Sequence, residues 1–569
     1  MFSPQLLVLV AVAAIVARLY ISRSRSASSS GGLVLPPGPK PLPILGNILD
    51  LTPKELWLRA TSWAKQYGDI TYIHVFGIPL VFLNTPQSVF DLLDRKGSIY
   101  SDKPQLTMVC DLCGCGDMVA FTGYGAQSKR QRKLLNLAFA GTRIPAYYPL
   151  ITRETNNFLQ RLLAPKAPDM TQEQAQMQYK SLIRLYAGQL TLSVVYGYQA
   201  RGSDDPFLGL AEECVDLLSN KIASGGGIWP VDIFPSLRYL PDWAPGSSFL
   251  RKAKAWKAKM TEFVDKPYEF VKSSMKSNTH RPSFCSTLLE NSEANPNAIS
   301  KEKTSSLPSE LSQFEIDLKW TANSMYSASG DTTMTTITYF LLQMALHPEI
   351  LAKARAELST LGTRLPTFAD RPNLPYCEAL FKETLRHNTA VPLSLPHRLM
   401  EDDVYVNPTT GKETLMKKGS LVFANIWAIT RDPKLWPAPP SQPNVTPEDF
   451  CPERHFLSEH DKAVLAGLAG TPEERDSLKR LLKARDPRTY VFGFGRRQCP
   501  GQNLVDSSAW LVMACLIAAV DWSFADGKAP EIKYENSVFR TPSNFRLDVR
   551  PRSEEWMSIV EASGLEEDD

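Results

Sequence analysis

The chain is expected to fold as a mainly helical protein with small β-sheets. Two short strand-like runs, ITYIHVF at residues 70–76 and PLVFLN at residues 79–84, stand near the start of the body. A second pair, VYVN at residues 404–407 and SLVFAN at residues 420–425, returns late in the chain. These runs are short and rich in β-branched and aromatic residues, whereas most of the remaining body has helical patterning. The sequence therefore predicts small sheets beside a large helical body.

Length and composition favour one large domain. The 569 residues exceed the length of a common domain, but no break in composition divides the chain. A hydrophobic share of 43% is enough for a substantial core. The 63 Lys and Arg residues nearly balance the 60 Asp and Glu residues, which gives no reason to expect nucleic-acid binding. We therefore expect a single large domain at residues 44–569.

The first residues have the pattern of a membrane anchor. Residues 6–17 are all apolar, and the stretch lengthens if Arg18 extends its guanidinium to the membrane interface. A cleaved signal peptide carries its positive charges before the apolar run, whereas here Arg18, Arg23 and Arg25 follow it. By the positive-inside rule, we expect residues 1–22 to span a membrane once and the body to lie in the cytosol.

Three other segments are predicted to lie at the surface. Residues 23–43 form a polar linker that ends in a Pro-rich stretch, and prolines stiffen the backbone into extended geometry. Residues 285–313 are poor in aromatic residues and rich in Ser, Asn, Pro and charge, which predicts an exposed loop. Residues 457–483 have a helix-like pattern and no evident chemistry.

Nine cysteines are too sparse in so long a chain for a disulfide framework, so reduced thiols are expected. Cys110, Cys113 and Cys115 form one local cluster that has the look of thiolate metal ligation. A structural zinc site needs four ligands, and no fourth Cys or His lies close by in the sequence. Metal binding is therefore the less favoured interpretation of this cluster.

The segment VFGFGRRQCPGQ, residues 491–502, has the features of a loop that holds a thiolate against a haem iron. Such a sulfur needs backbone amides turned toward it, because they keep the thiolate from being over-basic and help to fix the reduction potential. Gly493, Gly495 and Gly501 permit unusual dihedrals and close approach around Cys499.

Two side chains complete this loop. Phe492 can pack beside the sulfur, and Arg497 can meet a haem propionate. The segment that follows Gln502 is apolar enough to form a buried helix. The alternative is that Cys499 is merely a buried thiol in a Gly-rich turn.

This segment resembles the cytochrome P-450 family, whose pattern F-x-x-G-x-R-x-C-x-G is met in full by Phe492, Gly495, Arg497, Cys499 and Gly501. The resemblance extends over the body and is strongest to fungal microsomal members of secondary metabolism. It implies the cytochrome P-450 fold, a mainly α domain behind an N-terminal membrane anchor. It also implies haem b, iron protoporphyrin IX, with Cys499 as the axial iron ligand.

The resemblance assigns a structural role to Glu383 and Arg386, which are three residues apart and so share a helix face. Such pairs are usually surface ion pairs of little energetic worth. The family has E-x-x-R at this place, completed by an Arg from a downstream P-E-R segment, here Arg454. Two cations around one carboxylate are expected to form a buried triad.

The family's oxygen-binding pattern, A/G-G-x-D/E-T, aligns with residues 328–332, where Ser329 replaces the usual glycine. By resemblance, Thr332 would hold a proton-donating water and Asp331 would relay protons from solvent. The alternative for Thr332 is a hydrogen bond to its own helix backbone.

Propionate contacts are less complete. The family often has W-x-x-x-R in an early helix, and here Ser128 stands in place of the Trp while Arg132 is retained. Arg398 aligns with another propionate contact. His397 either assists Arg398 or is an ordinary loop histidine, and Lys129 is a candidate to compensate for the missing indole.

The resemblance implies a monooxygenase that takes electrons from NADPH through a cytochrome P-450 reductase and oxidises a hydrophobic small molecule at the endoplasmic reticulum membrane. A terpenoid or polyketide of fungal secondary metabolism is the favoured substrate class. The reductase is expected to meet Lys129, Arg130 and Lys133. The rival functions are an isomerase or dehydratase that acts on a peroxide without a reductase, and a non-enzymatic haem sensor. The regions expected to contact substrate are 108–121, 207–220, 325–329, 391–395 and 537–539.

Overall fold

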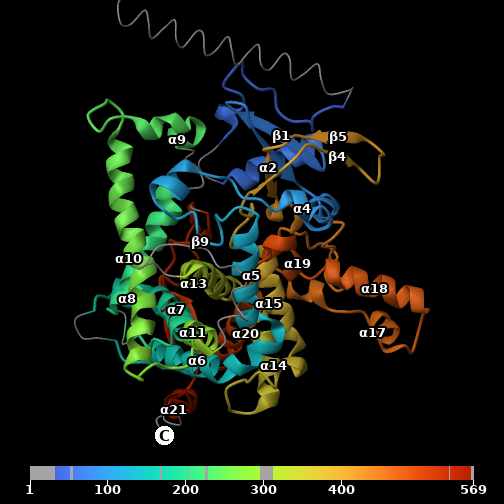
Figure 1. Cartoon of the computed structure of the whole chain (residues 1–569). Helices are drawn as coiled ribbons and strands as arrows, with labels where there is room; N and C mark the ends of the chain where they lie inside the picture. The colour runs from blue at the N-terminus through green and yellow to red at the C-terminus, as the bar shows by residue number, and fades with distance from the viewer. Residues whose placement is uncertain are drawn as a thin grey trace, which may run out of the picture. The chain divides into compact units, whose positions relative to one another are not determined.

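A computed structural model describes residues 33–564 except 52–54, 167–169, 201, 203, 224–228, 295–311 and 537 (Figure 1). The predicted anchor at residues 1–22 lies outside the described residues, as does the part of the predicted linker at residues 23–32. The described chain is mainly helical with small sheets, as the sequence predicted. It divides into two compact units. The first takes in the residues up to Pro104, Leu393–Ile429 and Phe494–Arg497, and the second takes in Gln105–Pro392, Thr430–Gly493 and the chain from Gln498 onward.

The first unit holds the predicted strands. Its four-stranded sheet has the order β1-β2-β6-β3, with β1 antiparallel to β2 and β2 parallel to β6, and a second sheet pairs β4 with β5. Trp63 and Phe82 pack in its core with ring centroids 5.6 Å apart. The elements of this unit are α2 (Leu56–Tyr67), β1 (Ile70–Val75), β2 (Ile78–Leu83), α3 (Pro86–Val89), α4 (Gly97–Tyr100), β3 (His397–Arg398), β4 (Asp403–Val406), β5 (Glu413–Met416), β6 (Leu421–Ala424) and α16 (Ile426–Ile429).

The second unit holds most of the helices and two small antiparallel sheets, β7 with β10 and β8 with β9. Its helices are α5 (Ala126–Phe139), α6 (Tyr148–Leu163), α7 (Gln172–Tyr196), α8 (Pro206–Asp216), α9 (Pro230–Ile233), α10 (Ser248–Lys276), α11 (Phe284–Ala294), α13 (Gln313–Leu346), α14 (Pro348–Leu358), α15 (Pro375–His387), α17 (Glu459–Ala466), α18 (Pro472–Ala484), α19 (Arg488–Val491), α20 (Gln502–Ala519) and α21 (Glu554–Ala562). Its strands are β7 (Val520–Phe524), β8 (Tyr534–Asn536), β9 (Arg540–Pro542) and β10 (Leu547–Pro551).

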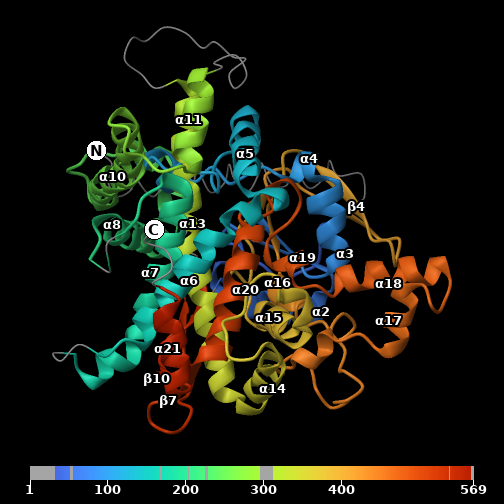
Figure 2. The same cartoon turned by 90° about the horizontal axis from the view of Figure 1, so that it is seen from below.

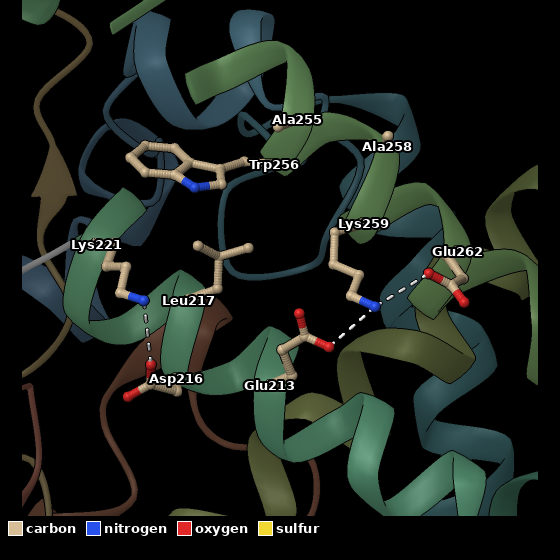
Figure 3. A pocket seen from close by; sticks show the side chains of 9 residues that line it. All are labelled: Glu213, Asp216, Leu217, Lys221, Ala255, Trp256, Ala258, Lys259 and Glu262. Carbon is tan, nitrogen blue, oxygen red and sulfur yellow. Dashed lines mark hydrogen bonds and ion pairs between the residues drawn. The ribbon is translucent and has the colours of Figure 1, made fainter. Parts of the chain in front are cut away.

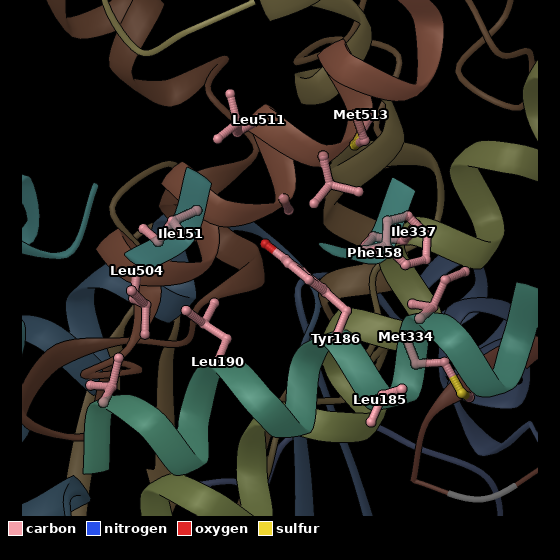
Figure 4. Packing of buried hydrophobic residues seen from close by; sticks show 14 of the residues in the cluster. Ile151, Phe158, Leu185, Tyr186, Leu190, Met334, Ile337, Leu504, Leu511 and Met513 are labelled. Atoms are coloured by element: carbon pink, nitrogen blue, oxygen red, sulfur yellow. The ribbon is translucent and has the colours of Figure 1, made fainter. Parts of the chain in front are cut away.

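The core of the second unit is built where α6, α7, α13 and α20 meet (Figure 4). Tyr186 of α7 is buried there and donates a hydrogen bond from its hydroxyl to the Ser508 carbonyl of α20, at 3.4 Å. Its ring also packs against Phe158 of α6, with centroids 5.7 Å apart. A buried tyrosine needs a partner for its hydroxyl, and this one finds it on the helix backbone.

The long helix α13 has clear end signals. The Ser312 hydroxyl accepts a hydrogen bond from the Glu315 amide, and the Glu315 carboxylate accepts one from the Ser312 amide, which is a capping box. At the other end, Pro348 begins α14 directly after His347, and proline cannot extend a preceding helix. These signals fix the 34 residues of α13 as one uninterrupted helix.

Helix α20 is the predicted apolar helix that follows the Cys499 loop. It is long and apolar enough to cross a membrane, but 78% of it is buried inside the protein. Within the described residues it is the one helix that passes this test of length and composition. Its burial marks it as a core helix, which fits the sequence prediction.

The predicted loop at residues 285–313 is wrong in its first part. Helix α11 spans Phe284–Ala294, and the side chains of Phe284, Cys285, Leu288 and Leu289 are buried. These apolar residues recur at helical spacing, which outweighs the polar composition of the segment. Residues 295–311 lie outside the described part of the chain.

The segment at residues 457–483 folds as the hairpin of α17 and α18, which projects away from α15 and α20 (Figures 1 and 2). Gly467 and Gly470 make the turn with positive φ of 77° and 69°. Arg475 closes the hairpin by donating from Nε to the Val464 carbonyl at 3.0 Å. This is a surface element, as its helix-like pattern predicted.

The Glu383 carboxylate lies at the centre of a buried cluster of cations. Arg386 donates to it from Nε and Nη2, both at 2.8 Å, and Arg454 donates from Nε at 3.1 Å. His455, which no sequence pattern indicated, contacts the same carboxylate at 2.9 Å. The remaining donors of the two arginines bind backbone carbonyls, so the Glu383 cluster ties α15 to the segment at residues 446–455.

We predict that replacing Glu383 strongly lowers the stability of the folded protein. Burial alone would raise the pKa of Glu383, but the charges and hydrogen bonds of Arg386 and His455 hold it well below the ordinary 4.5. Replacing Glu383 with Gln leaves buried cations uncompensated, and breaking a buried pair in this way costs about 3–5 kcal/mol. We expect a large drop in the thermal unfolding midpoint.

Glu262→Gln is the matched control, because it removes ion pairs with Lys259 and Lys266 that are partly exposed on α10. Since the folded-state pKa of Glu383 is depressed, its contribution should be complete above pH 4.5 and disappear as the pH falls through the folded-state value. An equal effect of both substitutions would contradict the prediction.

Candidate functional site

The Cys499 thiol lies just before the N-terminus of α20. The backbone N–H groups of Gly501 and Gln502 donate hydrogen bonds toward its sulfur. The Cys499 amide donates to the Phe492 carbonyl at 2.7 Å, which closes the loop on itself. Gly493 makes the intervening turn with a φ of 76°, in the left-handed region that favours glycine. The geometry is that of a sulfur held among backbone donors.

Burial and the neighbouring groups have opposite effects on the pKa of the Cys499 thiol. Burial raises the pKa of this thiol, whereas the amides of Gly501 and Gln502 and the charge of Arg132 lower it. Arg132 of α5 donates from Nη1 to the Gln498 carbonyl, next to Cys499. Burial lowers the pKa of Arg132, and the charge of Cys499 opposes this effect.

Arg132 also carries a buried nitrogen that lacks a hydrogen-bond partner. Its Nε atom is enclosed and unsatisfied among the described residues. A buried donor without a partner is costly, so a group that belongs at this place must accept from it. A propionate carboxylate has the chemistry to do so.

Gly495 and Arg497 of the predicted haem loop belong to the first unit. Gly495 has a φ of 54°, and a Cβ atom there would lie 2.2 Å from the Leu93 carbonyl oxygen, so only glycine fits. Arg497 donates from Nε to the Ser101 carbonyl at 2.7 Å. The Ser101 hydroxyl is buried and has no hydrogen-bond partner among the described residues. A second unsatisfied donor therefore lies beside Arg497.

Arg398 and His397 lie on β3 of the same unit. The Arg398 guanidinium is partly exposed and pairs loosely with Asp102, at 3.5 Å between Nη1 and Oδ2. His397 is buried, and its Nδ1 contacts the Tyr100 carbonyl oxygen at 2.8 Å. This contact is what the loop-histidine interpretation of His397 expects.

Gly501 differs from its predicted role. Its φ is −82°, which any residue adopts, and no atom lies within 4 Å of a Cβ placed there. The expected need for an unusual dihedral is therefore absent at this glycine. What Gly501 supplies is its backbone N–H group, directed toward Cys499.

The middle of α13 is open on one side. Ala328 is exposed, and Ser329, Asp331 and Thr332 are only partly buried, although the helix is buried from residue 333 to residue 344. The Thr332 hydroxyl donates to the Ala328 carbonyl at 2.9 Å. This is the local hydrogen bond that the alternative interpretation of Thr332 described.

That hydrogen bond leaves the Thr332 hydroxyl oxygen able to accept. A hydroxyl has one donor hydrogen and two acceptor lone pairs, so donation to Ala328 does not prevent Thr332 from binding a water. Ser329 donates in the same manner to the Tyr326 carbonyl at 3.1 Å, and α13 continues through it without a break. Burial raises the pKa of Asp331, which lies next to Thr332.

Helix α5 presents two exposed cations rather than three. Lys129 and Lys133 are exposed, and the Lys129 ammonium lies 5.5 Å from the centre of the Tyr124 ring. Arg130 instead pairs with the buried carboxylate of Asp317 on α13, at 2.5 Å. An exposed lysine held over an aromatic ring does not replace a buried indole donor, so the compensating role considered for Lys129 lacks support.

Ser128, which replaces the family's Trp, is buried at the start of α5. Its hydroxyl accepts from the Gly125 amide at 3.1 Å and lies 3.0 Å from the Gly125 carbonyl. The hydroxyl therefore caps the helix. The Ser128 hydroxyl therefore makes its hydrogen bonds to Gly125, in the first turn of α5.

The cysteine cluster is not arranged around a metal. Within the described ranges, no group of three or more Cys, His, Asp or Glu side chains is placed to hold a metal ion. Burial raises the pKa of Cys110 to about 11 and that of Cys113 to about 12. These thiols therefore stay protonated at neutral pH.

A surface pocket of about 510 Å³ lies between α8 and α10 (Figure 3). Trp256 and Leu217 provide its apolar walls, as the close view shows. Lys259 lies between Glu213 and Glu262, at 2.9 and 3.3 Å, so the charges of this pocket compensate one another. Glu213, Asp216 and Leu217 of this lining belong to the predicted substrate-contact segment 207–220. None of the residues predicted to bind haem or to transfer protons lines the pocket.

Comparisons with known proteins point to one family. A family model described as Cytochrome P450 matches residues 36–549. Cytochrome P450 monooxygenase claT of Ampulloclitocybe clavipes is 35% identical over 534 residues, 93% of each chain. Cytochrome P450 monooxygenase 208 of Postia placenta is 33% identical over 95% of this chain and 94% of the relative. Tryptamine 4-monooxygenase of Psilocybe cyanescens is 32% identical over 92% of this chain and 94% of the relative.

The position of Cys499 generates a spectroscopic prediction. Replacing it with His removes the thiolate, so the reduced carbon monoxide complex should lose its red-shifted Soret band. Cys515 of α20 is the control, because its buried thiol donates to the Pro366 carbonyl and no backbone amide acts on its sulfur. Cys515→Ala should keep the band. A band retained in Cys499→His would show that another residue binds the iron.

Proposed function

The chain belongs to the cytochrome P450 family, and on this premise we propose that it is a haem-thiolate monooxygenase that oxidises a hydrophobic small molecule. The single observation that carries the proposal is the placement of Cys499 among the amides of Gly501 and Gln502. The catalytic domain proposed, residues 44–569, takes in both compact units.

The residues present suit a haem. The unsatisfied Nε of Arg132 and the unsatisfied hydroxyl of Ser101 are donors that need acceptors, and propionate carboxylates are strong acceptors. We assign Arg132, Arg398 and Arg497 to the propionates and Cys499 to the iron. When bound, the haem supplies dioxygen activation, which no amino-acid side chain can provide.

The chain's own residues would manage protons and water. The Thr332 hydroxyl can hold a water at its free lone pairs, beside the exposed Ala328. The Asp331 carboxylate, whose pKa is raised by burial, can take a proton from solvent and pass it to that water. The buried Glu383 cluster has a structural role and contacts no reacting atom.

Electrons are proposed to come from NADPH through a membrane-bound cytochrome P450 reductase. The N-terminal segment, residues 1–22, is proposed to anchor the protein to the endoplasmic reticulum with its body in the cytosol. Such an anchor would keep the enzyme on the same membrane as its donor. Lys129 and Lys133 are the exposed cations of α5 that remain available to an acidic donor surface.

The substrate is proposed to be a fungal secondary metabolite with an apolar skeleton, such as a terpenoid or polyketide. The predicted contact segments at residues 108–121 and 207–220 contain buried Met108 and Val109 and partly buried Phe207. An apolar lining selects an apolar ligand. One relative is named for tryptamine, so an aromatic amine is a further class to include in a screen.

Expression of the chain with its reductase, followed by metabolite profiling, tests the function directly. Product formation should require NADPH, the reductase and dioxygen together. A product formed without NADPH would favour the isomerase or dehydratase instead, and haem binding without any product across apolar substrates would favour the sensor.

Thr332→Ala should uncouple oxygen use from product. The substitution removes the hydroxyl that is proposed to hold the proton-donating water, so more of the consumed oxygen should leave as hydrogen peroxide. Haem content and the spectral change on substrate binding should persist. The measurement is product and peroxide per NADPH. Thr336→Ala is a suitable control, because Thr336 bonds to the Thr332 carbonyl and lies one turn further along α13. An unchanged product yield would contradict the role of Thr332.

Changing Lys129 and Lys133 to Glu should slow reduction by the donor, mostly at low ionic strength, because charge steering is screened by salt. Arg130 is left intact, since a glutamate there would face the buried Asp317 carboxylate. The matched control changes Lys252 and Lys254, which are exposed on α10, to Glu. Stopped-flow reduction at several salt concentrations measures the effect. Equal slowing at all salt concentrations would contradict a steering role.

A further inference from the structure

The strands β8 and β9 form a hairpin that carries one of the segments predicted to contact substrate. Asn536 pairs with Arg540 across the two strands, so Val538 and Phe539 lie in the turn between them. Both of these side chains are partly buried, and together they are called the hairpin tip below. A hairpin of two strands is marginally stable by itself, so the position of its tip depends on contacts with the rest of the chain.

Arg540 binds the hairpin to the chain that follows α15. Its amide donates to the Ala390 carbonyl at 3.1 Å, and its Nη1 donates to Oδ1 of Asn388 at 2.5 Å. Asn388 is buried and donates from Nδ2 to the Arg540 carbonyl at 3.1 Å. The Arg540 guanidinium also lies 3.4 Å from the centre of the Tyr534 ring on β8. These bonds connect the hairpin with the residues just before the predicted substrate-contact segment 391–395.

A second anchor binds the hairpin to α13. The hydroxyl oxygens of Thr541 on β9 and Thr335 on α13 lie 2.6 Å apart, and both side chains are buried. Strand β9 packs against α13 (Figure 1). Thr335 is three residues after Thr332, so the two share one face of the helix. This hydrogen bond therefore fixes the hairpin relative to the part of α13 that is proposed to handle protons.

The two anchors hold the hairpin from both of its faces. Arg540 and Thr541 are consecutive residues of β9, and consecutive side chains of a strand point to opposite faces of the sheet. Hydrogen bonds fix a direction as well as a distance, whereas apolar packing is not directional. With one face bound to Asn388 and the other to Thr335, the hairpin can neither slide along α13 nor turn about its own axis.

We propose that Asn388, Thr335 and Thr541 are positioning residues that set the place of the hairpin tip and thereby select which apolar ligands the site accepts. The inference rests on the haem-thiolate function proposed above. The three residues do not contact the ligand themselves. The ligand meets the side chains of Val538 and Phe539, whose position the anchors determine.

The test uses the full-length haem protein and two probes that bind haem iron through an imidazole nitrogen. Imidazole carries no substituent, whereas clotrimazole carries three aromatic rings on the same ring system and so reaches further from the iron. Thr541→Val removes the hydroxyl and nearly keeps the shape of the side chain. It should weaken clotrimazole binding by about two- to tenfold, the range for one neutral hydrogen bond. Imidazole binding should stay unchanged. The shift of the Soret band on titration measures both.

Further variants identify the bond that is responsible. Thr335→Val should act like Thr541→Val, and the double substitution should add little, because both single changes remove the same hydrogen bond. Thr541→Ser keeps the hydroxyl and should restore clotrimazole binding. Asn388→Leu removes the other anchor, so its effect should add to that of Thr541→Val.

Thr338→Val is the matched control. Thr338 lies on α13 three residues after Thr335 and is fully buried, but its hydroxyl has no hydrogen-bond partner among the described residues. Its replacement should change the affinity for neither probe. Equal weakening of clotrimazole binding by Thr338→Val and Thr541→Val would overturn the inference, because it would show a general effect of changing buried threonines.

Hydrogen exchange of the peptide that contains β9 separates binding from folding. If exchange rises in Thr541→Val while clotrimazole binds as before, the hydroxyl pair only stabilises the hairpin and the positioning role is wrong. The reduced carbon monoxide spectrum and imidazole binding report on the haem site itself. If the unmodified chain takes up no haem, the proposed function fails and the inference with it. If the haem spectra are normal and clotrimazole affinity is the same in all variants, the inference alone fails.

Discussion

A buried sulfur that must carry negative charge is the constraint on which the rest of the site depends. Burial by itself favours the neutral thiol, so Cys499 needs compensation from its surroundings. The start of α20 provides part of it, because the first N–H groups of a helix have no partner within the helix. The amides of Gly501 and Gln502 are such groups, and Arg132 adds a full positive charge.

The loop before Cys499 is shaped to meet that constraint. Gly493 turns the chain, the Cys499 amide binds back to the Phe492 carbonyl, and Gly495 passes too close to the Leu93 carbonyl for any side chain. Away from the loop, the Glu383 cluster holds α15 against the segment around Arg454 and His455. This fully buried carboxylate resists displacement, because moving it away would leave the charges of Arg386 and Arg454 without their partner.

Helix α13 combines rigidity with an opening. Its ends are fixed by the Ser312 capping box and by Pro348, and its second half is buried against α7 and α20. The exposed Ala328 and the partly buried Asp331 and Thr332 interrupt that burial on one side only. Ala328, Asp331 and Thr332 therefore share one continuous helix. The groups proposed to transfer protons are held there without a break in the backbone hydrogen bonding.

Local patterns in the sequence were enough to predict the helical class, the strands near residues 70 and 420 and the helix after Cys499, because these features depend on local periodicity. The prediction failed at residues 284–294, where polar composition concealed the apolar spacing of α11. The sequence patterns did not predict contacts between distant segments. His455 against Glu383, Asp317 against Arg130 and Glu212 against Arg184 each join residues that no local pattern relates. These pairs became visible in the folded chain alone, because the charge that a side chain meets depends on which helices pack together.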